Sequence, residues 1–588
     1  MKNYQGKSKN TNTNVLGNII KLTVQSSFAV AVMGAPGTAA NFSITQVGTN
    51  SSDIFDDGAA LHTAYDPTSK NLFKINGSNK SLDIFNLEDL SGIEETLDSI
   101  SLEGLFGDFV VGGINDVAYS NSTFAVAIDN DTVTDDGIVA FFDPYGELIN
   151  QVTVGALPDS LTFTPDGSKL LVANEGEPNN EYTIDPEGSV SIIDMLDGAA
   201  NLTQDNVRFA GFQAFNDKVD ELKAEGVRIF GPNATVAQDL EPEAIAISED
   251  GETAWVTLQE NNALGILDIT TGEFTDIVAL GFKDHSLPDN GIDGSDKDDA
   301  INIQNYPVFG MYQPDEVVAY KVGDETYLVT ANEGDSREYT FDDDNGEEQK
   351  AFVEETEVAD VVLDPTAFPN ASTLQQEDVI GRLEITNTMG DTDGDGDFDE
   401  LYAFGGRSFS IWNEHGALVF DSGDDFEQIT AKLFPDFFNS NNDDNDSFDN
   451  RSDNKGPEPE GVAIGEVDGR TLAFIGLERI GGFMTYDVSN QLAPKFISYT
   501  TNRDFDGDPE TGTAGDLGIE GLTFISAKES PNGVALLVTA NEVSGTTTIY
   551  QIEPVPEPGT IFGLLAFGAA GKLLLKRKSK TIQEPEKA

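Results

Sequence analysis

The chain of 588 residues has no cysteine and few basic residues. Without cysteine there is no disulfide, zinc–thiolate site or cysteine nucleophile, so stability comes from packing and from any bound metal. There are 104 Asp and Glu but only 33 Lys and Arg, which gives a formal net charge of -71. Such a surface repels nucleic acid and anionic lipid and attracts divalent cations. The composition therefore argues against nucleic acid as a partner, and a solvated acidic coat is the simplest interpretation of the charge.

Sequence motifs of the common enzyme classes are equally scarce. His62, His285 and His415 lie in unrelated contexts, and the chain has neither a G-x-S-x-G nucleophile elbow nor a P-loop. These absences argue against the best-known hydrolase and nucleotide-binding sites. They leave open whether the protein is an enzyme.

Helical periodicity is almost missing as well. Segment 215–227 is the one convincing amphipathic stretch, with Val219, Leu222 and Val227 on one side. The remaining chain consists of short apolar or alternating runs separated by Gly, Asp, Asn and Pro turns. We therefore expect an all-β protein with one short peripheral helix.

The short runs repeat a common order. An acidic residue opens a strand, as in "PEAIAI", "PDEVVAY" and "PEGVAI", a turn follows, and the next strand ends in a carboxylate, as in "LLVANE", "YLVTANE" and "LLVTANE". This order is typical of β-propeller blades, which usually take about 40–45 residues. Because these repeats lie further apart, we expect seven blades with long loop insertions, and six or eight blades or a parallel β-helix are the alternatives. The parts "DVIGRLEITNTMG" and "ELYAFGGRSFSIW" belong to one blade or to two.

Equivalent residues of successive blades form a ring around the channel of a propeller. Glutamates occupy equivalent strand ends and equivalent strand starts. They are Glu175, Glu260, Glu333, Glu478 and Glu542 at the ends, and Glu243, Glu316, Glu460 and Glu520 at the starts. If both sets face one mouth, their charges repel strongly in a low dielectric unless they are neutralised. We therefore expect something cationic at the mouth of the channel.

Three arginines stand where they would meet these carboxylates, namely Arg337, Arg407 and Arg479. One interpretation is that they steady an anionic ligand at the mouth. The other interpretation is structural, with Arg–carboxylate bridges that join neighbouring blades. The sequence identifies no catalytic residue.

Five aspartates alternate along the segment "DTDGDGDFDE" and are Asp391, Asp393, Asp395, Asp397 and Asp399. Calcium prefers six to eight oxygen ligands, and this spacing curls carboxylates around one ion while a glycine at the sixth position permits the sharp turn. The twelfth position is Tyr402 rather than Glu, so the loop departs from an EF-hand. We predict a calcium site here, and a solvated acidic loop is the alternative.

Both ends of the chain carry targeting signals. A basic lead, a short apolar run and small residues before Asn41 predict a secretory signal, with a buried first strand as the alternative. Near the other end, "VPEP" precedes an apolar stretch at 561–575 and a basic cluster. This stretch, which Lys572 interrupts, is short for a membrane span of roughly 20 residues.

The order of Pro-Glu-Pro, apolar stretch and basic cluster resembles the PEP-CTERM sorting tail of Gram-negative bacteria. The resemblance implies recognition by exosortase-type sorting machinery at the cell envelope, and a permanent single-span anchor is the alternative. Lys572 and the additional "TIQEPEKA" depart from the pattern and bear on cleavage. We therefore divide the chain into a signal over 1–40, a propeller domain over 41–554 and a sorting tail over 555–588, the one part that meets the membrane.

Between the two ends, long motifs resemble the choice-of-anchor I family. They are "GVRIFGPNATVAQDLEPE", "GMYQPDEV", "LVTANEGDSREY", "DTDGDGDFDELYAFGGRSFSIW", "DNRSDNKGPEPEGV" and "GLERIGGFMTYDVSN". The resemblance runs from about Phe42 to Pro554. It implies an extracellular β-propeller attached to the bacterial envelope, and it carries over no catalytic residue.

Two classes of function stay open. The first is an exported, calcium-stabilised surface protein with a binding or structural role, which presents its loops to an envelope polymer. The second is a calcium-dependent phosphoesterase, similar to an alkaline phosphatase or a phytase. In that class, calcium neutralises the carboxylates and holds a phosphate-containing ligand, while one of the three arginines steadies the anion. We favour the first class.

The sorting tail generates the first testable prediction. Deletion of 555–588 removes the apolar stretch and the basic cluster, so the truncated protein should be released into the medium. Immunoblots of cell and medium fractions measure this directly. A truncated form that stays bound to cells would show that the tail is not the anchor.

Overall fold

The computed structural model describes residues 42–90, 93, 99–343 and 345–555. The expected secretory signal, and the sorting tail after Val555, lie outside these residues. The described residues form seven four-stranded sheets, together with a five-stranded sheet and a two-stranded hairpin. The all-β propeller class predicted from the sequence is confirmed, and we interpret each four-stranded sheet as one blade.

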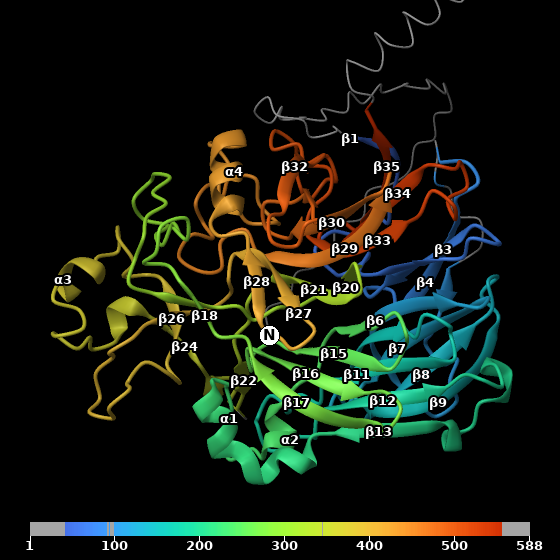
Figure 1. Cartoon of the computed structure of the whole chain (residues 1–588), viewed down its shortest axis with the longest axis horizontal. Helices are drawn as coiled ribbons and strands as arrows, with labels where there is room; N and C mark the ends of the chain where they lie inside the picture. Colours follow the sequence, from blue (N-terminus) through green and yellow to red (C-terminus); the bar gives the residue numbers. More distant parts are fainter. Residues whose placement is uncertain (1–41, 91–92, 94–98, 344, 556–588) are drawn as a thin grey trace, which may run out of the picture.

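The blades form a closed ring in which the first strand of each blade lies innermost, beside the first strand of the next (Figure 1). These innermost strands are β2 (Thr63–Tyr65), β6 (Val111–Ser120), β10 (Pro158–Phe163), β14 (Ile245–Ile247), β20 (Val317–Val322), β29 (Pro459–Val467) and β33 (Ile519–Ile525). We call the end of the central channel at which these strands begin the mouth.

The remaining strands of each blade follow outward from the channel. The second strands are β3 (Asn71–Asn76), β7 (Thr123–Asn130), β11 (Lys169–Asn174), β15 (Thr253–Leu258), β21 (Glu325–Asn332), β30 (Arg470–Leu477) and β34 (Ala535–Asn541). The third strands are β4 (Ser81–Asn86), β8 (Asp136–Phe142), β12 (Ser189–Asp194), β16 (Ala263–Asp268), β27 (Ser408–Asn413), β31 (Phe483–Asp487) and β35 (Thr546–Pro554). The outermost strands are β5 (Ile100–Ser101), β9 (Leu148–Ala156), β13 (Val207–Gly211), β17 (Glu273–Ala279), β28 (Leu418–Asp421), β32 (Lys495–Thr500) and β1 (Phe42–Ser51).

The first and last strands of the described chain close the ring. β1 pairs antiparallel with β35, from Phe42 opposite Pro554 to Ser51 opposite Thr546. The outermost strand of the last blade therefore comes from the opposite end of the chain. This pairing joins the two ends by backbone hydrogen bonds, which takes the place of a covalent link in a chain without disulfides.

The hydrophobic core is divided among the contacts between neighbouring blades. A separate buried cluster fills each of the seven gaps between adjacent sheets. In one of these gaps, Phe141 of β8 packs with Leu170 and Val172 of β11. The apolar residues of the middle strands thus face adjacent blades, which leaves the innermost strands free to carry polar side chains at the channel.

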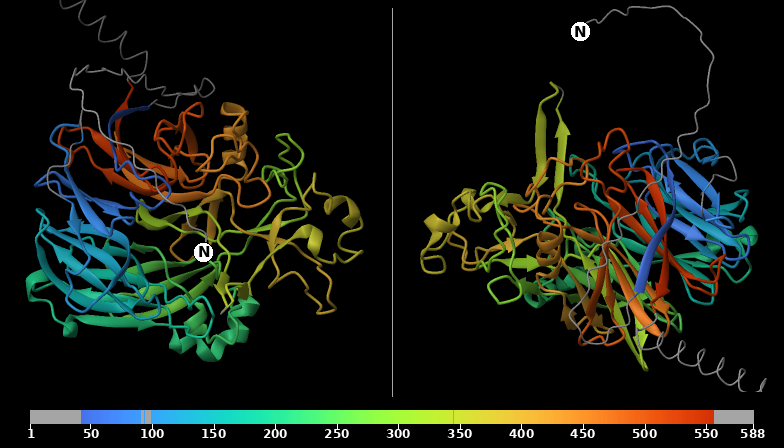
Figure 2. Two further views of the ribbon diagram at one scale, coloured as in Figure 1. Left: turned by 180° about the vertical axis from the view of Figure 1, so that it is seen from behind. Right: turned by 90° about the horizontal axis from the view of Figure 1, so that it is seen from above.

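Two long connections, one between β17 and β20 and the other between β21 and β27, form an insertion beside the ring (Figures 1 and 2). Its five-stranded sheet contains β18 (Phe282–Asp284), β19 (Phe309–Met311), β26 (Tyr402–Ala403), β25 (Glu384–Thr386) and β24 (Glu355–Glu357). The insertion has its own buried cluster, which includes Tyr306, Leu383 and Leu401. The hairpin β22 (Glu338–Asp342) and β23 (Glu348–Val353) stands away from the ring in the right-hand view of Figure 2.

This insertion explains the repeat that was ambiguous in the sequence. The strand in "GRLEIT" is β25 and belongs to the insertion, whereas the strand in "RSFSIW" is β27 and is the third strand of the β20 blade. The second and third strands of that blade are therefore separated by the whole segment from Asn332 to Ser408.

Helices are peripheral. The expected helix at 215–227 begins as a 3-10 turn, η3 (Gln213–Lys218), continues as α1 (Val219–Glu225) and ends at Gly226 with a φ of 101°. The structure adds α2 (Val236–Asp239), α3 (Ala371–Leu374) and α4 (Asp425–Leu433), which the sequence analysis does not predict. α4 buries Phe426 against the blades of β20 and β29.

Candidate functional site at the channel mouth

The repeated Asn-Glu pair marks the point where second strands reach the mouth. Asn174, Asn332 and Asn541 end their strands and are completely buried. Their side-chain amides donate to the third strand of the same blade, to Ser191 Oγ at 2.9 Å, Ser410 Oγ at 2.8 Å and the Thr546 carbonyl at 3.1 Å. Each amide thus fixes the strand end, and the glutamate that follows leaves the sheet at the mouth.

A second set of acidic residues stands where the innermost strands begin. Glu316 directly precedes β20, Glu243 lies two residues before β14, and Glu460 and Glu520 are the second residues of β29 and β33. The structure adds Asp159 and Asp315 at the strand starts, and Asp116 within β6, whose charge acts on Glu316. The sequence analysis left out all three. His62, just before β2, completes the set with its Nδ1 3.8 Å from Asp116 Oδ1. The sequence could have indicated Asp159 and Asp315, because each follows a proline as Glu460 does. The segments "PDSL" and "PDEV" match "PEGV" in this way.

The structure brings all nine predicted glutamates into one electrostatic network. Burial raises the pKa of Glu243 well above its usual value, and the charges of Glu260, Asp315 and Glu175 add to that effect. Burial likewise raises the pKa of Glu460, with further contributions from Glu520, Glu478 and Glu333. For Glu316 and Glu520, burial and neighbouring carboxylates raise the pKa to about 8. Glu542 joins the network through the charge of Glu333.

The three arginines have different places. Arg337 is buried and donates to Asp239 Oδ1 at 2.5 Å and Glu241 Oε2 at 2.6 Å. Arg479 lies at the mouth, with its Nε 2.8 Å from Glu458 Oε2.

Arg407 is bound to groups outside the mouth pocket. Its guanidinium binds Glu427 Oε1 at 2.6 Å, the Asp293 carbonyl at 2.7 Å and the Ser452 carbonyl at 2.9 Å. It therefore holds the segment that leads to Lys455, and among the described residues it does not line the pocket at the mouth.

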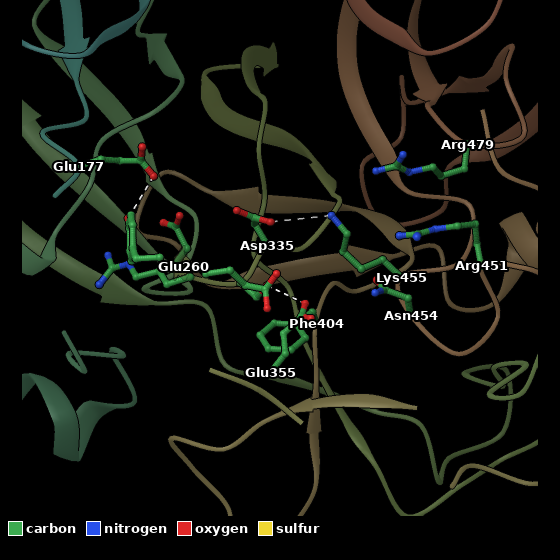
Figure 3. Close-up of a pocket in the computed structure, with 13 residues that line it drawn as sticks. Glu177, Glu260, Asp335, Glu355, Phe404, Arg451, Asn454, Lys455 and Arg479 are labelled. Atoms are coloured by element: carbon green, nitrogen blue, oxygen red, sulfur yellow. Dashed lines mark hydrogen bonds and ion pairs between the residues drawn. The ribbon is translucent and has the colours of Figure 1, made fainter. Parts of the chain in front are cut away.

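A pocket of about 410 Å³ lies at the mouth, between the ring and the insertion. Its walls carry opposite charges (Figure 3). The acidic residues are Glu177, Glu260, Asp335, Glu338 and Glu355, and the basic residues are Arg337, Arg451, Lys455 and Arg479. Figure 3 shows Glu177 and Glu260 on one side, facing Lys455, Arg451 and Arg479 on the other, with Asp335 between them.

Glu458 organises the basic wall. It is fully buried and has a φ of 47°. Arg451 Nε lies 2.9 Å from Glu458 Oε1, and Lys455 Nζ lies 3.3 Å from Glu458 Oε2. Burial alone would raise the pKa of Glu458, but Lys455, Arg451 and Arg479 hold it well below its usual value. Lys455 also binds Glu333 Oε1 at 2.7 Å. Arg451 and Lys455 both come from the segment "DNRSDNKGPEPEGV", which leads into the predicted mouth glutamate Glu460.

The predicted calcium loop lies in the insertion, apart from the mouth pocket. Asp391 accepts hydrogen bonds from the backbone N–H groups of Gly394 at 2.8 Å and Gly396 at 3.0 Å. The structure groups the loop aspartates in two sets, each with carboxylate oxygens within 4.8 Å of one another. The sets are Asp391, Asp393 and Asp399, and Asp364, Asp397 and Asp399. Asp395 belongs to neither set, and Asp364 is an addition that the local spacing did not indicate.

Comparison with known proteins places the chain in a family. The model of the choice-of-anchor I domain matches residues 62–491, and the model of the PEP-CTERM protein-sorting motif matches residues 554–578. Together these matches indicate an exported protein of the cell surface. No helix among the described residues is both long and apolar enough to cross a membrane.

Two curated proteins are similar in sequence. Gigasin-3a of Magallana gigas is 29% identical over 204 residues, which cover 32% of this chain and 70% of that protein. The mesenchyme-specific cell surface glycoprotein of Strongylocentrotus purpuratus is 30% identical over 289 residues, which cover 44% of this chain but 36% of that protein.

Solved structures with low sequence identity are similar over most of the chain. Hydrazine synthase of Kuenenia stuttgartiensis has a TM-score of 0.40 at 14% identity and covers 84% of this chain and 96% of its own. Streptogramin B lyase has a TM-score of 0.39 at 9% identity and covers 88% of this chain and 99% of its own.

The raised carboxyl pKa values predict how stability depends on pH. The folded protein binds protons at Glu316 and Glu520 up to about pH 8, whereas an unfolded glutamate releases its proton near pH 4.3. In a chelator, the free energy of unfolding should therefore fall as pH rises from about 5 to 8, by about 1.4 kcal/mol for each unit of pKa difference, and the melting temperature should fall with it.

Scanning calorimetry across this pH range measures the effect. Glu316→Gln and Glu520→Gln should reduce the pH dependence, whereas Glu466→Gln, an exposed change on β29, should leave it unchanged. Glu458 works in the opposite direction, but its pKa lies below this window. His285, whose pKa burial lowers to about 3, partly offsets the fall below about pH 6.5. A melting temperature that rises with pH would contradict the prediction.

Proposed function

Because the chain belongs to the choice-of-anchor I family and carries a PEP-CTERM sorting motif, we propose that this surface-anchored propeller protein is a calcium-stabilised binding protein. Its ligand site is the mouth pocket. The observation that carries the proposal is the pairing of an acidic and a basic wall across a cavity of about 410 Å³. Ligand sites are typically concave and present a few convergent polar groups.

The arginines favour binding over catalysis. Arg337 and Arg407 are buried in ion pairs with Asp239, Glu241 and Glu427, so their guanidinium groups hold the fold together. Arg479 and Lys455 line the pocket, but both also neutralise Glu458. A group that stabilises a transition state must be free to meet developing charge on a substrate. These cations are better suited to holding a ligand than to transforming it.

The polarity of the pocket indicates the class of ligand. Carboxylates such as Glu177 and Asp335 accept hydrogen bonds from hydroxyl groups, whereas Lys455 and Arg479 donate to anionic groups. A hydroxyl-rich envelope polymer that carries phosphate or carboxylate groups presents both. The exported location and the sorting motif support this class of ligand, because such polymers occur at the cell envelope.

A calcium-dependent phosphoesterase is the second candidate. The observation in its favour is that Glu177 and Glu260 face Lys455 and Arg479 across the pocket. Carboxylates that hold calcium, opposite cations that hold a phosphate, would polarise a phosphate ester. A role in turnover would require Lys455 or Arg479 to exchange Glu458 for the substrate.

Binding of defined polymers to the full chain tests the proposal. We expect polygalacturonate or phosphorylated dextran to bind in the presence of calcium, and neutral dextran to bind much more weakly. Lys455→Gln should weaken binding by about tenfold or more, because a charged hydrogen bond contributes about 1.5–3 kcal/mol. Calorimetric titration measures the affinity. The control is Lys321→Gln, which changes an exposed lysine of β20 that is paired with Glu249.

The same preparations should not hydrolyse p-nitrophenyl phosphate at any calcium concentration. Calcium-dependent hydrolysis that Lys455→Gln abolishes would instead establish the phosphoesterase. Equal affinity for charged and neutral polymers would remove the basis for a charged ligand site.

Calcium stabilisation is proposed for the loop that carries Asp391, Asp393 and Asp399. An ion bound only by the folded state stabilises it by about 2.7 kcal/mol at a hundredfold excess over the dissociation constant. The double variant Asp393→Ala/Asp395→Ala should therefore lose part of the calcium-dependent rise in melting temperature. Asp131→Ala/Asp135→Ala, which removes two exposed aspartates between β7 and β8, should keep it. An unchanged response of the loop variant would contradict a calcium site there.

A further inference from the structure

The carboxylates at the mouth form two clusters that differ in how their charge is compensated. The first contains Glu333, Glu458 and Glu478, and the second contains Glu175, Glu177 and Glu260. In each cluster, one oxygen from each residue lies within 4.8 Å of the others. We call the second cluster the Glu175 triad.

The first cluster already has its cations. Lys455 binds Glu333 at 2.7 Å, and Arg479 lies 2.8 Å from Glu458 and 3.2 Å from Glu478. Arg451 adds a further ion pair with Glu458. Three basic side chains thus neutralise three carboxylates, and this cluster needs no other ion.

The Glu175 triad has no such partner. Across the described ranges, no Lys, Arg or His nitrogen lies within 4.0 Å of a carboxylate oxygen of the triad. The nearby Arg337 forms its ion pairs with Asp239 and Glu241, and its charge acts on Glu177 and Glu260 without an ion pair to either. Glu177 accepts one hydrogen bond, from Tyr339 Oη at 3.1 Å, which orients the carboxylate without neutralising it.

A buried carboxylate oxygen of the triad that has no hydrogen-bond partner indicates that a cation binds there. Glu260 is only 2% exposed, and its Oε2 is buried without a hydrogen-bond partner. Glu243, whose charge acts on the same group of carboxylates, also has a buried Oε2 without a partner. A buried carboxylate oxygen with neither a donor nor a cation is costly, and coordination to a metal ion removes that cost.

We propose that Glu175, Glu177 and Glu260 bind a divalent cation at the acidic wall of the mouth pocket. Glu175 and Glu177 follow β11 and Glu260 follows β15, so the ion would join two neighbouring blades. Carboxylate oxygens are hard ligands that suit Ca²⁺, Mg²⁺ or Mn²⁺. Calcium is the first choice, because it accepts six to eight oxygen ligands in flexible geometry.

The site is separate from the acidic loop and open to the pocket. Glu177 and Glu260 line the pocket, so the coordination positions left by the triad face the cavity. An anionic group of the ligand would complete the coordination sphere from that side, and this extension alone rests on the proposed function. The ion itself is tested with metal salts and no polymer.

The test begins with a background in which the acidic loop is disabled, the full-length Asp393→Ala/Asp395→Ala protein, stripped with chelator and dialysed. Titration with calcium chloride should show one remaining binding event. Glu260→Gln in this background should weaken that event by about tenfold or more, because it removes one of three charged ligands. Glu466→Gln, which removes a charge from the exposed side of β29, is the matched control and should bind as the background does.

Melting curves give a second readout. Without metal, Glu260→Gln should melt at the same temperature as the background or higher, since it relieves repulsion. With calcium, its melting temperature should no longer rise. If Glu260→Gln fails to fold, Glu177→Gln at the edge of the pocket should show the same losses.

The outcomes decide the proposal separately from the ligand. The site is overturned if the background binds neither calcium, magnesium nor manganese, or if Glu260→Gln and Glu177→Gln respond to metal as Glu466→Gln does. Calcium binding at the triad without polymer binding would leave the site intact and contradict the proposed function. Polymer binding that is identical in chelator and in calcium would support the proposed function and contradict coordination of the ligand by the ion.

Discussion

The crowding of carboxylates on the propeller axis is the constraint on which the mouth depends. Six of the seven blades deliver acidic residues to the same place, and the β2 blade delivers His62, because the innermost strands start there and the second strands end there. Like charges at such distances repel strongly in a low dielectric. Basic side chains offset this repulsion on one side of the mouth, where Lys455, Arg451 and Arg479 surround Glu458. On the other side, the pKa of Glu177 is raised to about 7, so bound protons or a metal ion offset the repulsion there.

The insertion supplies most of what makes the mouth a pocket. Asp335, Glu338, Tyr339, Glu355 and Phe404 belong to the segment between β21 and β27, and all five line the cavity. Arg337 in that segment is bound to Asp239 and Glu241, which lie between blades. The guanidinium thus fixes the insertion to the ring. Its structural role follows from complete burial and two carboxylate partners, neither of which the sequence reveals.

The sequence predicts those features of the fold and the mouth that follow from the blade repeat. The positions of Glu175, Glu333 and Glu542 follow from their place after equivalent strands, and the propeller class follows from the order of strands and turns. Residues outside the repeat were not predictable in this way. Lys455 and Asp364 reach their partners through irregular segments, and Arg407 binds Glu427 of α4 instead of lining the mouth pocket. No periodicity encodes those paths, which tertiary packing determines.

The closure of the ring by β1 and β35 also sets the direction in which the molecule faces. β34 ends at the mouth with Asn541, which pairs with Thr546, so β35 starts at the mouth and runs to Pro554 on the far side. The sorting motif begins at residue 554. The tether therefore leaves from the face opposite the pocket. A propeller held in this way turns the face opposite the mouth toward the envelope that carries it and its charged opening toward the surroundings.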